Sequence, residues 1–132
     1  MKTAFLVFIV SMTFVCAEKL RYSSEFVDVI DAARRDCALK ENVDIQLLSL
    51  LDDIKDLPSR ETLKCLSFCV IRKLNLVNSQ SILSYDKTIQ LFDDPDMIAE
   101  VSASYIKCDF KEKEMNTCDD GYDIHKCLLV NV

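Results

Sequence analysis

The spacing of the cysteines constrains the fold of this chain more than any other feature. Six of the seven cysteines lie between residues 37 and 127, with 27, 3, 38, 9 and 8 residues between neighbours. They are Cys37, Cys65, Cys69, Cys108, Cys118 and Cys127. In a short exported chain such a set favours disulfides, with about 15 pairings to choose from. A bond between Cys65 and Cys69, one helical turn apart, would strain the helix, so we expect each to pair elsewhere.

The N-terminal residues have the layout of a signal peptide. Lys2 supplies one positive charge, and Ala4 to Val15 form an almost wholly apolar run. Compact residues precede the charged Glu18, so we place the cleavage site after Ala17. The run is shorter than the roughly 20 residues of a membrane span, which argues against a retained anchor. We therefore expect residues 1–17, with the seventh cysteine, to be removed and residues 18–132 to form a secreted domain.

Composition excludes several classes of protein. Without residues 1–17, 15 Lys and Arg stand against 22 Asp and Glu, a net charge of −7. Such a chain repels phosphate backbones, so we expect no nucleic-acid partner. We also expect no membrane insertion, because the chain has no apolar run long enough to span a bilayer. The remaining length suits one domain. One glycine and two prolines argue against sandwiches and propellers, so the chain is expected to be mostly helical.

Apolar periodicity and capping residues predict about six helices. Pro58 is expected to end the second helix, and Ser59 is expected to cap the third. Asn75 should end that third helix, because asparagine tolerates left-handed geometry. Ser84 precedes a short fourth helix, and Asp94-Pro95 starts the fifth, since proline suits the first helical position. The expected ranges are 26–37, 44–57, 60–74, 85–92, 95–108 and from 119 or 120 to 128.

Metal binding and catalysis have little support in the sequence. A zinc site built from Cys65, Cys69 and either His125 or Cys127 competes with disulfides, but structural zinc usually gathers its ligands in two compact pairs. His125 is the only histidine, and its neighbours include neither a nucleophile nor an orienting acid. We expect no enzyme, no cofactor and no metal. His125 is expected at the surface or partly buried, with pH sensing as the alternative role.

The order of the cysteine gaps closely resembles the pattern of the insect pheromone- and odorant-binding proteins. The resemblance covers nearly all of residues 18–132 and includes Lys73-Leu74-Asn75-Leu76, where the family often has glycine in place of Asn75. It implies an all-α fold, a compact bundle of about six helices with three interlocked disulfides around an apolar cavity. The implied pairs are Cys37 with Cys69, Cys65 with Cys118, and Cys108 with Cys127.

The resemblance also implies a function. Such a protein is secreted and binds small hydrophobic ligands, odorants or pheromones, for transport through sensillar lymph or another extracellular fluid. A membrane odorant receptor and a second copy of the chain are the implied macromolecular partners. Two alternatives stay open: a non-olfactory carrier of lipids or hormones in haemolymph or gland secretion, and an extracellular protein-interaction module. The apolar candidates for the pocket are Leu66, Val70, Leu83, Ile89, Phe92, Met97, Val101, Tyr105, Ile124 and Leu128.

Overall fold

The computed structural model describes residues 20–132, so the expected signal peptide and its cleavage site lie outside the described residues. Within this range the chain is helical, apart from two isolated β-bridges. Its α-helices are α2 (Ser24–Lys40), α3 (Arg60–Lys73), α4 (Tyr85–Ile89), α5 (Pro95–Lys107) and α6 (Cys118–Val130). Three short 3₁₀ helices complete it: η1 (Ile45–Leu50), η2 (Ile54–Asp56) and η3 (Phe110–Glu112). The predicted all-helical fold is confirmed.

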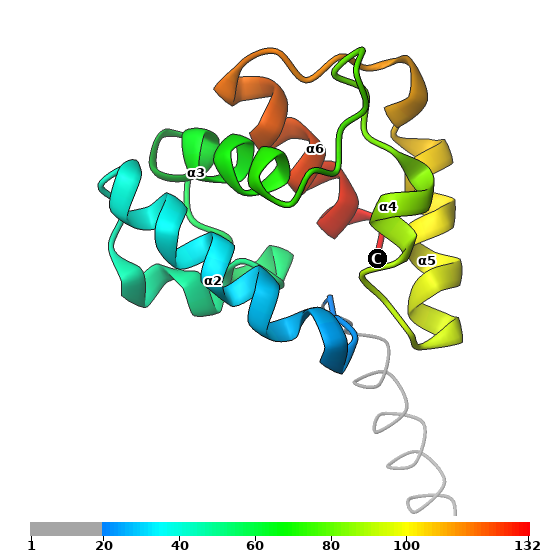
Figure 1. Cartoon of the computed structure of the whole chain (residues 1–132), viewed down its shortest axis with the longest axis horizontal. Coiled ribbons are helices and arrows are strands. Elements are labelled where there is room, and N and C mark those ends of the chain that lie inside the picture. The colour runs from blue at the N-terminus through cyan, green and yellow to red at the C-terminus, as the bar shows by residue number, and fades with distance from the viewer. Residues whose placement is uncertain (1–19) are drawn as a thin grey trace, which may run out of the picture.

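Helices α3 and α6 lie side by side at the centre of the molecule (Figure 1). Helix α2 flanks this pair on one side, and α4 and α5 lie on the other. Gly121 on α6, the only glycine of the chain, allows the close approach. A Cβ atom placed on it would lie 2.5 Å from the Cα of Phe68 on α3, a distance that real Cβ atoms essentially never show. The central helix pair therefore depends on a missing side chain.

Three disulfides tie the helices together and overlap along the chain. Their Cα–Cα distances are 5.8 Å for Cys37–Cys69, 4.5 Å for Cys65–Cys118 and 6.2 Å for Cys108–Cys127. They join α2 to α3, α3 to α6, and the end of α5 to α6, and they are the pairs that the family resemblance implies. In the chain-entropy account each loop of this length adds on the order of 3–4 kcal/mol, which helps the fold tolerate an internal cavity.

Side-chain capping explains the starts of α4, α5 and α6, whereas Ser59 precedes α3 as predicted but its side chain makes no capping hydrogen bond. The Ser84 and Asp94 side chains cap α4 and α5, and Asn75 adopts a positive φ of 57° after α3, as expected from the sequence. Helix α6 begins earlier than predicted, because Thr117 and Asp120 form a reciprocal capping box that places Cys118 in the first turn.

The predicted second helix, 44–57, is wrong. The structure has η1 and η2 there, separated by a turn at residues 51–53. Asp53 accepts a hydrogen bond from the backbone N–H of Lys55 at 3.0 Å and so caps a new 3₁₀ helix inside the apolar repeat. Aspartate side chains compete with helical hydrogen bonding in this way. The turn leaves the carbonyl oxygens of Leu51 and Asp52 available to other parts of the chain.

Candidate functional site: an apolar pocket between four helices

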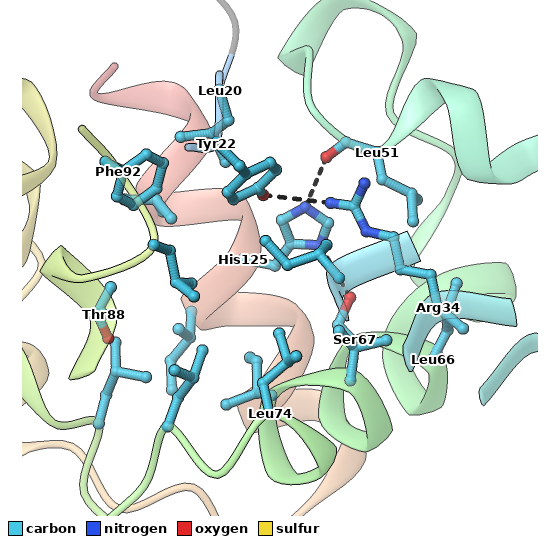
Figure 2. Close-up of a pocket in the computed structure, with 18 residues that line it drawn as sticks. Leu20, Tyr22, Arg34, Leu51, Leu66, Ser67, Leu74, Thr88, Phe92 and His125 are labelled. Atoms are coloured by element: carbon cyan, nitrogen blue, oxygen red, sulfur yellow. Dashed lines mark hydrogen bonds between the residues drawn. The ribbon is translucent and has the colours of Figure 1, made fainter. Parts of the chain in front are cut away.

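A cavity of about 80 Å³ lies among α2, α3, α4 and α6 (Figure 2). One water molecule needs roughly 10–15 Å³, so the cavity has room for a small organic molecule. Most of the wall is aliphatic, and it is built from six separate stretches of the chain. The lining residues are Leu20, Tyr22, Ile30, Arg34, Leu51, Leu66, Ser67, Val70, Ile71, Leu74, Leu76, Leu83, Thr88, Leu91, Phe92, Ile124, His125 and Leu128.

The structure brings together six of the ten residues that the sequence put forward for the pocket. These are Leu66, Val70, Leu83, Phe92, Ile124 and Leu128. The other four, Ile89, Met97, Val101 and Tyr105, are not part of the lining.

The four residues outside the lining belong to the solid core. Met97 and Val101 are 1% exposed, and Ile89 and Tyr105 pack against the same apolar cluster. The Tyr105 hydroxyl donates a hydrogen bond to the carbonyl oxygen of Leu83 at 2.8 Å. Helix α5 packs against α4, η3 and α6 and gives no residue to the described lining. Apolar periodicity identified the inward face of α5, but it carries no information on whether that face meets a cavity or other side chains.

Twelve lining residues were not among the candidates that the sequence put forward for the pocket. One signal was present, because Arg34 follows Ile30 by one helical turn and places a charge beside the apolar face of the first helix. No periodic pattern marks Leu20 and Tyr22, which precede that helix. The full set is Leu20, Tyr22, Ile30, Arg34, Leu51, Ser67, Ile71, Leu74, Leu76, Thr88, Leu91 and His125.

The segment of residues 20–23 closes one side of the pocket. The backbone N–H of Leu20 donates to the carbonyl oxygen of Asp52 at 3.0 Å, and that of Ser23 donates to Leu91 at 2.8 Å. The Tyr22 ring stacks on Phe92, with 5.2 Å between ring centroids (Figure 2). The segment thus joins the turn at residues 51–53 to the chain that follows α4.

A charged network lies behind Tyr22. Arg34 donates to both carboxylate oxygens of Asp52, at 2.7 and 3.1 Å, and the Tyr22 hydroxyl donates to Asp52 at 3.0 Å. Burial raises the pKa of Tyr22 well above its usual value, and the Asp52 charge acts in the same direction. Burial alone would lower the pKa of Arg34, but its hydrogen bonds to Asp52 and Tyr22 and its electrostatic interactions with both groups together outweigh this and raise it. Arg34 therefore stays charged and paired, and Tyr22 stays neutral.

His125 links α6 to two other elements at the pocket wall. Its Nε2 lies 2.7 Å from the carbonyl oxygen of Leu51, and its Nδ1 lies 2.9 Å from the Ser67 hydroxyl (Figure 2). A carbonyl oxygen can only accept, so Nε2 carries the proton and Nδ1 accepts from Ser67. Burial lowers the pKa of His125, the bond to Leu51 opposes that shift, Arg34 lowers the pKa further and Asp52 raises it. The neutral ring is favoured.

Folding stability is expected to fall as the pH drops below about 6.5, the ordinary pKa of histidine. Because the folded-state pKa of His125 is lowered, protonation favours the unfolded chain, and the stability given by the neutral ring is lost toward acid pH. The Tm of the wild type should fall between about pH 7.5 and pH 5.5. The Tm of His125→Gln, whose amide can both donate and accept, should fall less.

Since His125 is the only histidine, the comparison isolates its titration, and the N-terminal amine is common to both proteins. Equal slopes of Tm against pH for the two proteins would show that the ring does not titrate differently in the folded and unfolded states. Carboxylates such as Asp120, whose pKa is lowered chiefly by the backbone N–H of Asn116, act at more acidic pH.

A partly enclosed apolar cavity in a helical, disulfide-linked domain is typical of proteins that bind small hydrophobic molecules. Within residues 20–132 no helix has the length and apolarity to cross a bilayer, and no three His, Cys, Asp or Glu residues are placed to hold a metal ion. The sequence model of the PBP/GOBP family matches residues 19–131, so the chain belongs to this family of insect pheromone- and odorant-binding proteins. Its members are secreted proteins that bind small hydrophobic ligands and are not enzymes. No curated protein sequence matches the chain.

Proposed function

We propose that this protein is secreted after loss of residues 1–17 and carries a small apolar molecule, an odorant or pheromone, through an extracellular aqueous fluid. The observation that carries the proposal is the partly enclosed apolar pocket, in which four of the five polar lining side chains are engaged by protein groups. Those four are Tyr22, Arg34, Ser67 and His125. They shape the wall of the pocket, while the aliphatic side chains offer contact to a ligand.

The mechanism is burial without chemical change. Each methylene group that leaves water contributes about 0.8 kcal/mol, so affinity rises with chain length until the cavity is full. A further methylene then has no space and forces side chains apart, which costs affinity. A length optimum is therefore the signature of binding inside the pocket, whereas adsorption to the protein surface gives no such optimum.

The test is displacement of a fluorescent apolar probe from the oxidised, delipidated chain without residues 1–17. Competitors are primary alcohols, aldehydes and esters of graded chain length. We expect saturable displacement, an affinity gain of about fourfold for each added methylene before the optimum, and a loss beyond it. Absence of saturable binding by a helical protein with all six cysteines paired would overturn the carrier function and favour an extracellular protein-interaction module.

A further inference from the structure

One polar group of the pocket has no partner in the protein. Thr88 lies on α4, lines the cavity and is 5% exposed, and its hydroxyl oxygen makes no hydrogen bond. A helical threonine often donates its hydroxyl to the carbonyl one turn back. Here the backbone N–H of Thr88 already occupies the carbonyl oxygen of Ser84, at 3.1 Å, and the hydroxyl does not share it. A buried hydroxyl left in this state is unfavourable.

The other polar side chains of the wall behave differently. Tyr22, Arg34, Ser67 and His125 all have partners within 3.2 Å. Figure 2 shows Thr88 across the pocket from Arg34 and Ser67, among aliphatic side chains. Thr88, at the α4 end, is therefore the one side chain among the described lining residues whose polar group has no hydrogen bond that a ligand would have to share or replace.

We infer that the pocket selects apolar molecules with one oxygen atom that accepts a hydrogen bond from Thr88. This inference rests on the proposed function and adds the polar group of the ligand and the place where it binds. The oxygen lies at the α4 end, and the hydrocarbon part extends along α3 and α6 toward the opposite wall. Alcohols, aldehydes and esters all supply such an acceptor, whereas a hydrocarbon does not.

The inference is tested with Thr88→Val, which replaces the hydroxyl by a methyl group of similar size. Affinities are measured by probe displacement for an alkane and for the alcohol, aldehyde and methyl ester of matched length. Thr88→Val should weaken binding of the oxygenated ligands by about three- to tenfold, the range for one lost hydrogen bond. Binding of the alkane should be unchanged or tighter. The ligand class with the largest loss identifies the preferred acceptor.

Thr62→Val is the matched control, because it makes the same chemical change at an exposed position of α3 that does not line the pocket. This variant should leave all four affinities unchanged. Thr88→Ser keeps the hydroxyl and should keep the preference for oxygenated ligands. If the valine variant does not fold, the comparison of Thr88→Ser with Thr88→Ala tests the hydroxyl instead.

The outcomes separate the two proposals. If the wild type binds the probe and the length series but Thr88→Val loses no affinity for oxygenated ligands relative to the alkane, the role of Thr88 is overturned and the carrier function stands. If the wild type binds neither probe nor ligands, the carrier function fails, and the inference fails with it.

Discussion

Replacement of Gly121 by alanine is expected to lower the free energy of unfolding by about 3 kcal/mol, the upper part of the usual range for overpacking. The new Cβ would lie 2.5 Å from the Cα and 2.6 Å from the backbone nitrogen of Phe68. Backbone atoms cannot rotate aside, so α3 and α6 must separate. The Cys65–Cys118 bond, three residues from Gly121, resists that movement. The better helix propensity of alanine returns only about 1 kcal/mol.

Equilibrium unfolding of the oxidised protein in urea measures the effect. Lys126→Ala, at an exposed position of the same helix, serves as the control and should change stability by less than about 0.5 kcal/mol. A Gly121→Ala variant as stable as the wild type would contradict the close approach of the two central helices.

The Val70→Trp substitution is expected to weaken binding of the apolar probe by about 100-fold. Val70 lies on α3 one turn from both Leu66 and Leu74, and all three line the pocket. The indole would occupy space in a cavity of about 80 Å³. If the indole keeps three to four methylene groups of the ligand out of the pocket, at about 0.8 kcal/mol each, the affinity falls by about a hundredfold.

Val29→Trp makes the same chemical change at a position on α2 that is 51% exposed and outside the lining. Its affinity for the probe should match that of the wild type, and circular dichroism should show the same helix content in all three proteins. Equal probe binding by the two tryptophan variants would place the binding site somewhere other than this cavity.

Features that depend on short stretches of chain were predictable from the sequence. Ser84, Asp94 and Asn75 cap or end their helices through contacts within one turn, and the structure places them as expected. The disulfide pairing is a different case, because the residues alone left many pairings open and the family resemblance supplied the choice. Periodicity misread residues 44–57, since it gives no weight to the Asp53 side chain that competes for the backbone.

Sequence reasoning identified only six of the eighteen residues that line the pocket, because the wall of the pocket is a property of the packed fold. Spacing identifies the residues on an apolar helix face, but it does not show what that face contacts. Met97 packs against other side chains, whereas Leu128 lines the cavity. Leu20 reaches the pocket through a hydrogen bond to Asp52, 32 positions away. Arg34 tolerates its place beside the cavity because Asp52 pairs with it. Contacts of this kind between distant residues leave no local pattern.

The position of α5 has a consequence for how this protein can diversify. Among the described residues, those that touch the cavity belong to the 20–23 segment, to α2, α3, α4 and α6 and to the chain between them, while α5 supports this wall from behind. Substitutions in the wall can therefore shift chemical preference while α5 preserves the scaffold. The outward side of α5, where Ile106 is 77% exposed, is correspondingly a neutral site for attaching a reporter dye.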